Sequence, residues 1–241
     1  MRRSSRLAKR AFDLFFAVVL LVPTLPLMVW TSARILRHDG WPVLYAAERI
    51  GQYGQPFVQY KFRTMVHAAG PEQGVSGGDK AHRITPLGHR LRAARLDELP
   101  QMFNVLNGTM SFVGPRPPAP QYVARFPETY ADVLQMKPGI TGLATVMFHV
   151  HEEWLLKDTS SAAQTDDIYV RRCVPRKAML DRLYAKSWSM RLDLYLIYLT
   201  LGKGFRWPGP RLDRMRRRAV RARAPEQGEP ARPRRALPTS G

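Results

Sequence analysis

Two adjacent carboxylates, Asp97 and Glu98, stand at the start of an apolar stretch with the spacing of a helix. Apolar residues recur at intervals of three and four through residues 99–106, which predicts an amphipathic helix over residues 97–107. Pro100 suits the first turn of this helix, because an N–H at that position would have no helical partner. The carboxylates would therefore lie at the helix N-terminus, where free N–H groups and the helix dipole favour anions.

Two arginines, Arg92 and Arg95, precede this carboxylate pair. Carboxylates beside cations suit a nucleophile, a divalent cation and a phosphorylated substrate. The simpler interpretation is that Asp97 only caps the helix, and helix physics alone favours it. The surrounding sequence therefore has to decide between a cap and a reactive site.

Further short motifs flank the carboxylate pair in a fixed order. They are ERIGQYGQPF at residues 48–57, YKFRTM at 60–65, SFVGPRP at 111–117 and KPGITGL at 137–143. With this order and spacing, the chain resembles the bacterial sugar transferases known as monotopic phosphoglycosyl transferases. The resemblance extends from about Lys9 to Thr200, and the combination of motifs is far more specific than any one of them.

This resemblance implies transfer of a sugar-1-phosphate from a UDP-sugar to polyprenol (undecaprenyl) phosphate, with release of UMP. Such a step initiates the assembly of an exopolysaccharide, a capsule or an O-antigen-like glycan. The resemblance also implies a covalent phosphosugar intermediate on Asp97. It assigns Mg²⁺, with Mn²⁺ as the alternative ion, to Glu98 and Asp97, and Mg²⁺ commonly takes one or two carboxylates together with phosphate oxygens.

Four cationic side chains are expected to bind the substrate phosphates. Arg92 matches a family arginine near the phosphates. Arg116 is the strongest candidate, because prolines on both sides fix its backbone and orient a bidentate guanidinium. Lys61 and Arg63 alternate with aromatic residues and would share one face of a strand. A solvated strand face would explain a lone basic pair of this kind equally well.

The chain departs from the family pattern at several positions, among them Thr109, which replaces a frequent acidic residue. Arg95 stands where the family usually has a small hydroxyl residue, and it adds positive charge beside Asp97. Residues 144–148 replace the usual Gln-Val-x-Gly-Arg pattern, so a segment that could discriminate sugars is divergent. The HVHEE run at residues 149–153 would place two histidines on one face of a strand, and a zinc or manganese site there competes with a polar loop.

An uncharged run at residues 14–33 is long enough to cross a bilayer as a helix. Pro23 and Pro26 interrupt this run, and basic residues flank both of its ends. The positive-inside rule then asks for both ends on the cytoplasmic side. A spanning helix and a cleaved signal peptide are the alternatives, but we expect a re-entrant membrane helix that breaks at these prolines. Apolar residues 192–201 suit an interfacial helix or a buried core helix.

The chain is strongly basic, with 38 Lys and Arg against 19 Asp and Glu and a net charge of +19. This charge predicts a polyanionic partner, which could be anionic lipid, nucleic acid or a phosphorylated substrate. Residues 206–241 contain eleven arginines and six prolines, so we expect a disordered tail that binds anionic inner-leaflet lipid. The single cysteine, Cys173, allows no internal disulfide and favours a cytoplasm-facing location.

The expected fold is α/β (α+β-like), a mostly helical monotopic membrane domain with a small sheet. We expect helices over 10–36, 97–107, 119–134 and 175–201, and strands at Val43–Ala46 and Phe57–Lys61, with further strands at Val113 and Leu143–Met147. No glycine fingerprint follows a strand, so the pattern does not indicate a Rossmann fold.

Three parts follow along the chain. Residues 1–37 are the basic N-terminus and the re-entrant helix, residues 38–205 the catalytic domain and residues 206–241 the tail. The expected location is the bacterial inner membrane, with the catalytic domain facing the cytoplasm and no nucleic acid expected as partner. The alternative function is a non-catalytic, membrane-anchored protein that binds polyanions or acts as a scaffold. The sequence leaves the sugar, the glycan pathway and the oligomeric state open.

Overall fold

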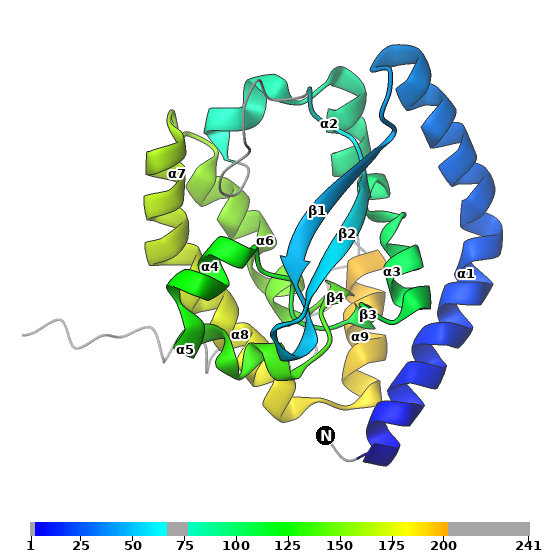
Figure 1. Cartoon of the computed structure of the whole chain (residues 1–241), viewed down its shortest axis with the longest axis vertical. Helices are drawn as coiled ribbons and strands as arrows, with labels where there is room; N and C mark the ends of the chain where they lie inside the picture. The colour runs from blue at the N-terminus through cyan, green and yellow to red at the C-terminus, as the bar shows by residue number, and fades with distance from the viewer. Residues whose placement is uncertain (1–2, 67–76, 202–241) are drawn as a thin grey trace, which may run out of the picture. The chain divides into compact units, whose positions relative to one another are not determined.

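The computed structural model of the chain describes residues 3–66 and 77–201 (Figure 1). The predicted tail, residues 206–241, lies outside the described residues. In chain order, the elements are α1 Arg3–His38, β1 Leu44–Ile50, η1 Gln52–Gly54, β2 Pro56–Phe62, η2 Gly78–Arg83, α2 Pro86–Ala93, η3 Leu96–Glu98, α3 Gln101–Asn107, β3 Ser111–Val113, α4 Pro120–Arg125, α5 Pro127–Ala131, η4 Val133–Gln135, β4 Gly139–Thr141, α6 Leu143–Leu156, α7 Ala162–Ile168, η5 Tyr169–Cys173, α8 Val174–Ser187 and α9 Met190–Leu201. Helices therefore dominate the described part of the chain, as predicted.

The strands in the described residues form two separate pairs. β1 and β2 make an antiparallel hairpin in which Leu44 lies opposite Phe62. β3 and β4 pair in parallel, with Val113 opposite Thr141. The predicted strands at residues 43–46 and 57–61 are confirmed, and each extends further than predicted. The single small sheet of the prediction is replaced by two two-stranded sheets.

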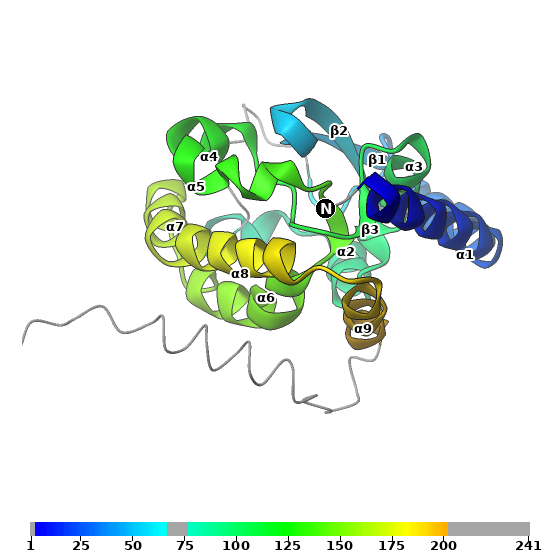
Figure 2. The same cartoon turned by 90° about the horizontal axis from the view of Figure 1, so that it is seen from below.

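The strand predicted at Leu143–Met147 is wrong, because these residues begin helix α6. A short apolar run cannot be assigned to helix or strand from its periodicity alone. In α6, Leu143, Ala144 and Phe148 are buried, and the helix packs against α8 and α9. Figure 2 shows α6 and α8 side by side. Tertiary packing therefore decides the conformation of this segment.

Two of the predicted helices are divided. The segment 119–134 forms α4, α5 and the short turn η4. Pro127 starts α5 at its first position, since a proline cannot continue the hydrogen-bond pattern of a preceding helix. The segment 175–201 forms α8 and α9, and the chain is extended between them at Trp188, where ψ is 133°.

Helix α1 is continuous through Pro23 and Pro26, and Figure 1 shows it bowed along its length. Thr24 lies between the two prolines, and its hydroxyl donates a hydrogen bond of 2.6 Å to the carbonyl oxygen of Leu20. Hydroxyl bonds of this kind to the preceding turn often bend helices. The structure shows no interruption of α1 at either proline, and the re-entrant topology stays a prediction.

One face of α1 carries exposed apolar side chains. Among the described residues, α1 is the one helix that is long and apolar enough to cross a membrane, by length and composition. The exposed large apolar residues along its middle are Leu14, Phe15, Val18, Val19, Leu20, Val22, Leu25, Val29 and Trp30. In α9, Leu192 and Leu196 are buried while Leu194 and Tyr198 are exposed. The core-helix interpretation is therefore correct for one face of α9, and the interfacial one remains a prediction for the other.

Buried polar contacts attach the first turns of α1 to the rest of the domain. Lys9 donates a 2.5 Å bond to the Asp193 carboxylate, which also accepts from Tyr184 at 2.7 Å and from Trp188 at 3.1 Å. Asp193 is wholly buried. A buried charge pair that is hydrogen-bonded on all sides tolerates the loss of either partner poorly.

Replacing this carboxylate, Asp193→Asn, is expected to lower the free energy of unfolding by about 3–5 kcal/mol, because Lys9 is left as a buried charge without its partner. Denaturation of both proteins in detergent measures the effect. The matched control is Asp158→Asn. The Asp158 side chain is 85% exposed, and its carboxylate lies 3.7 Å from the Lys157 ammonium. We expect this substitution to change the free energy of unfolding by no more than about 0.5 kcal/mol. Equal losses in the two variants would contradict a special role for the buried pair.

Candidate active site

The carboxylate pair lies in a turn that precedes helix α3. The predicted helix over residues 97–107 begins later than predicted, at Gln101, and a short 3₁₀ turn, η3, holds Asp97 and Glu98. Pro100 has no N–H to bond the Leu96 carbonyl, which instead accepts from the Leu99 N–H at 3.2 Å. This hydrogen bond joins residues three positions apart, whereas an α-helix joins residues four apart, so the chain forms a tighter 3₁₀ turn here.

The chain reaches this turn through a left-handed residue. Arg95 has φ 55° and ψ 22°, a conformation that few residues other than glycine adopt. This reversal lets the Arg95 side chain fold back onto the turn that follows, where it bonds Glu98. The arginine that departs from the family pattern is thus part of the local structure.

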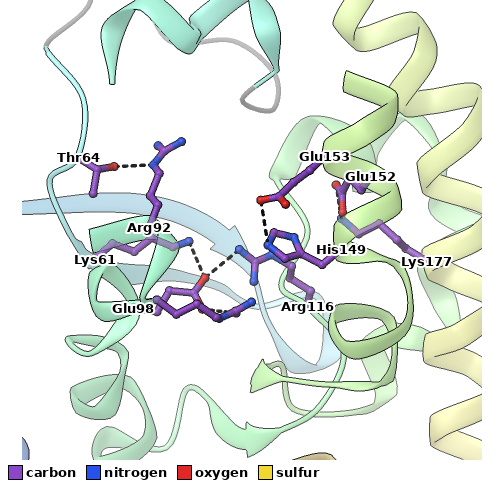
Figure 3. A network of polar contacts seen from close by, with 10 residues as sticks. Lys61, Thr64, Arg92, Glu98, Arg116, His149, Glu152, Glu153 and Lys177 are labelled. Atoms are coloured by element: carbon purple, nitrogen blue, oxygen red, sulfur yellow. Dashed lines mark hydrogen bonds and ion pairs between the residues drawn. The ribbon is translucent and has the colours of Figure 1, made fainter. Parts of the chain in front are cut away.

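Glu98 is buried and makes three ion pairs (Figure 3). Its Oε1 accepts from Arg116 at 3.1 Å and from Lys61 at 3.3 Å, and its Oε2 accepts from Arg95 at 2.5 Å. Burial alone would raise the pKa of Glu98, but the three cations together hold that pKa well below its usual value. The lowered pKa favours the ionised carboxylate of Glu98, which keeps three cationic groups in place.

Asp97 is half-buried and differs from its neighbour. Within residues 3–66 and 77–201, its carboxylate makes no hydrogen bond or ion pair, although it lines the same cavity. Burial raises the pKa of Asp97, and the positive charge of Lys61 opposes this rise only in part. Its oxygens are thus available for a substrate or a metal ion.

A cavity of about 540 Å³ opens in front of the carboxylate pair, within the size range of small-molecule sites. Its walls come from the β1–β2 hairpin, α2, η3, the loop after β3, and the helical elements α4, α5, α6, η5 and α8. The candidate site residues that line it are Lys61, Arg63, Arg92, Asp97, Glu98 and Arg116. The structure thus gathers residues from distant parts of the chain around one space.

Helix α2 positions Arg92 at this cavity. Gly88 lets the helix pack directly on the preceding segment, since a Cβ at Gly88 would lie 2.1 Å from the Thr64 carbonyl oxygen. The Arg92 Nε then donates a 2.9 Å hydrogen bond to the Thr64 hydroxyl.

Lys61, on β2, is a second cation at the cavity. Burial lowers the pKa of Lys61 to about 8, although the negative charge of Glu98 opposes that shift.

Arg63 has different partners from Lys61. Its guanidinium donates to the carbonyl oxygens of Asp39 at 2.5 Å, Gly40 at 2.6 Å and Trp41 at 3.3 Å. These carbonyls follow the C-terminal end of α1, so Arg63 fixes the connection between α1 and the hairpin. The structure does not direct this guanidinium to the carboxylate pair.

The carboxylates suit a divalent cation that is shared with a phosphorylated substrate. The described residues contain no group of three or more His, Cys, Asp or Glu side chains able to hold a metal ion alone. Asp97 has a free carboxylate, and Mg²⁺ is usually held by one or two carboxylates with phosphate oxygens and water. The residues present therefore fit Mg²⁺ only together with the substrate phosphates.

Comparison with known proteins identifies the family. A family model described as bacterial sugar transferase matches residues 4–207. The chain belongs to this family. A relative in Bacillus subtilis, named uncharacterized sugar transferase EpsL, is 34% identical over 195 residues, which cover 81% of this chain and 86% of the relative.

Two longer relatives have names that state a reaction. The UDP-glucose:undecaprenyl-phosphate glucose-1-phosphate transferase of Klebsiella pneumoniae is 33% identical, over 82% of this chain and 40% of the relative. The undecaprenyl-phosphate galactose phosphotransferase of Salmonella typhimurium is 31% identical, over 83% of this chain and 40% of the relative. The chain thus spans about two fifths of the length of these two relatives.

Several residues that line the cavity were not predicted from the sequence as substrate-binding or catalytic residues. Arg49, on β1, lines the cavity and its pKa is lowered by burial and by Arg116. His149 and His151 lie on α6 and not on a strand, so they do not share a strand face, and His149 pairs with Glu153 at 3.2 Å. Glu152 belongs to the same HVHEE run, for which the sequence predicts only a metal site or a polar loop. Lys177 and Asp181 lie on α8 and also line the cavity. Helical spacing was the available signal for these two residues, but it does not distinguish cavity residues from core residues.

Asp181 is expected to make the stability of the protein depend on pH. Burial raises the pKa of Asp181 from its ordinary 3.8 to about 8, against the opposing charges of Lys177 and Arg116, and Tyr130 also faces it. A carboxyl whose pKa is raised by folding stabilises the fold while protonated. This contribution is complete below about pH 4 and is lost as the pH rises through about 8.

We therefore expect the free energy of unfolding to fall more steeply between pH 4 and pH 8 in the wild type than in Asp181→Asn, which cannot ionise. Each unit of pKa corresponds to about 1.4 kcal/mol, so the difference amounts to several kcal/mol. Urea denaturation of both proteins at pH 5 and pH 8 measures it. Parallel pH dependence in the two proteins would show that Asp181 is not protonated in the fold.

Proposed function

We propose that this protein transfers a sugar-1-phosphate from a UDP-sugar to polyprenol (undecaprenyl) phosphate and releases UMP. The observation that carries the proposal is an unpaired carboxylate, Asp97, beside a triply paired one, Glu98, in a cavity lined by cationic side chains. The names of the Klebsiella and Salmonella relatives support both substrates. Family membership supports a transferase reaction.

The reaction would proceed in two displacements at the same phosphorus. Asp97 attacks the phosphorus that carries the sugar, the bond from this phosphorus to the bridging oxygen breaks, and UMP leaves with the electron pair. A phosphate oxygen of polyprenol phosphate then attacks the same phosphorus, and the bond to Asp97 breaks and restores the carboxylate. Neither displacement needs a proton from the protein.

The cationic side chains supply the charge that this reaction requires. Phosphoryl transfer depends mainly on positioning and on neutralising charge, and less on the strength of the nucleophile. Arg116 and Arg92 would hold the diphosphate, and Glu98 would keep Arg116 and Lys61 oriented toward it. Mg²⁺ or Mn²⁺ bound by Glu98 and Asp97 would reduce the repulsion between the attacking carboxylate and the diphosphate.

The lipid acceptor supports a membrane location. We infer that α1 is a re-entrant helix with both ends on the cytoplasmic side of the bacterial inner membrane, so that the catalytic domain faces the cytoplasm. Its exposed apolar face supports membrane contact, and the basic residues on both sides of the apolar run support the orientation.

Deleting the residues after Trp207 tests the lipid-binding role proposed for the tail. Binding to anionic liposomes should then weaken, and the loss should be largest at low salt.

The deciding experiment measures UMP release by the full chain in detergent or nanodiscs, with a panel of UDP-sugars and polyprenol phosphate. We expect release with at least one UDP-sugar. Mass spectrometry after incubation with that donor and no acceptor should detect a sugar-phosphate adduct on Asp97. An adduct on another residue would overturn the proposed intermediate. Absence of UMP release in folded, membrane-inserted protein, together with salt-sensitive binding to generic polyanions, would favour the non-catalytic alternative.

A further inference from the structure

One wall of the cavity is unused by the reaction steps proposed above. We call it the helical wall, because its residues come from α4, α5, α6, η5 and α8. It consists of Tyr122, Tyr130, Glu152, Tyr169, Lys177 and Asp181. In Figure 3, Arg116 and His149 lie between Glu98 and the Glu152–Lys177 pair. Arg116 interacts electrostatically with both Glu98 and Glu152, so the helical wall begins where the proposed phosphate site ends.

A charged pair stands at the centre of the helical wall. Lys177 donates to both oxygens of Glu152, at 2.8 and 3.1 Å, and to the Tyr169 hydroxyl at 3.3 Å. The side chains of Lys177 and Glu152 are 15% and 17% exposed. The pair is thus held rigidly but still reaches the cavity, where it can exchange hydrogen bonds with a ligand.

Asp181 adds a polar group that lacks a partner. It is 4% exposed and lines the cavity. Its Oδ1 is buried and has no hydrogen-bond partner among the described residues. Buried polar atoms in folded proteins are nearly always hydrogen-bonded, so an atom of this kind at a cavity indicates a ligand group or a water molecule that completes it.

The chemistry of the helical wall fits a polyhydroxylated ring. Carboxylates accept hydrogen bonds from hydroxyl groups, an ammonium donates to them, and phenol rings offer both an apolar face and a polar hydroxyl. Glu152 is already paired with Lys177 and burial keeps the Asp181 carboxyl protonated below about pH 8, so the helical wall has no excess positive charge and suits a phosphate poorly, in contrast to the three cations around Glu98. In the proposed reaction, the sugar is attached to the phosphorus that Asp97 attacks. The uridine is attached to the other phosphate of the diphosphate, so it is one phosphate further from the attacked phosphorus.

From these observations we propose that the helical wall binds the sugar of the UDP-sugar, and that Glu152, Lys177 and Asp181 determine which sugar is accepted. This inference rests on the proposed function. Relatives of the chain have names that state different sugars, namely galactose, glucose and N-acetylgalactosamine. The divergent segment 144–148 belongs to α6, the helix that carries Glu152.

The test compares binding of UDP with binding of UDP-glucose, UDP-galactose and UDP-N-acetylgalactosamine. All proteins are full chains that also carry Asp97→Asn, so that no turnover disturbs the titration. We expect Glu152→Gln to lower the affinity for the preferred UDP-sugar about tenfold or more, because a hydrogen bond to a charged group is lost. The affinity for UDP should stay within about twofold of its original value. Asp158→Asn replaces an exposed carboxylate outside the cavity, and it should leave the affinities for UDP and for the UDP-sugars unchanged.

A second variant protects the test against misfolding. Asp181→Asn breaks no ion pair and should change the ranking of the three UDP-sugars without changing the affinity for UDP. Equal losses for UDP and for UDP-sugars would assign the helical wall to the nucleotide and overturn the inference, as would unchanged binding of all ligands in both variants. Binding is measured without turnover, so a failed UMP assay would reject the proposed reaction while these titrations still decide the sugar site.

Discussion

Asp97→Asn is expected to abolish UMP release, with a loss of about 10³-fold or more, while the protein remains folded. The amide cannot form the covalent bond to phosphorus that the proposed reaction requires, and removing a nucleophile usually costs this much or more. The structure gives no reason for a folding defect, because the Asp97 carboxylate makes no hydrogen bond or ion pair with the described residues. The measurement is UMP release at saturating UDP-sugar and polyprenol phosphate.

The thermal midpoint provides the control for this variant. Burial raises the pKa of Asp97, so removing a partly buried charge should leave the midpoint unchanged or raise it slightly. Asp158→Asn, a change of the same type at an exposed position, should keep wild-type activity. Activity in Asp97→Asn above about a tenth of the wild-type rate would place the nucleophile elsewhere.

Glu98→Gln is expected to lower the free energy of unfolding by about 3–5 kcal/mol, because three cationic groups then lose their common counter-charge. Lys61, Arg95 and Arg116 all bond this one buried carboxylate. Without it, they repel each other in a partly desolvated space. Chemical denaturation of the purified full chain in detergent measures the loss.

A matched control separates this effect from the chemistry of the substitution. Glu153→Gln changes a carboxylate that is 66% exposed and pairs with His149, and we expect a change within about 0.5 kcal/mol. Combining Glu98→Gln with Arg95→Ser should recover part of the stability, since one of the three repelling cations is removed. Equal losses in Glu98→Gln and Glu153→Gln, or no recovery in the double variant, would contradict the counter-ion role.

These two predictions give adjacent carboxylates opposite properties. Asp97 is expected to be dispensable for folding and essential for the reaction. Glu98 is expected to be important for both, since it holds the cations that would bind phosphate. Local sequence cannot distinguish the two, because they share one short turn and the same neighbours along the chain.

The sequence by itself determined the order of the motifs, and with it the family, which the matching family model confirms over residues 4–207. It also determined the strands β1 and β2, although not their pairing, and the long apolar helix α1. These features depend on residues within a few positions of each other, since alternation predicts strands and continuous apolar runs predict long helices. Local patterns of this kind are present in the sequence before the chain folds.

Tertiary structure alone decided how the site residues are used. Lys61 and Arg116 lie 37 and 18 positions from Glu98 in the sequence, yet both bond it. Arg63 stands only two positions from Lys61, yet it bonds the carbonyl oxygens that follow α1 and not Glu98. The segment that begins at Leu143 folds as a helix, because packing against α8 and α9 buries one side of it. Ion pairs and packing join distant parts of the chain, and no periodicity along the sequence records which parts will meet.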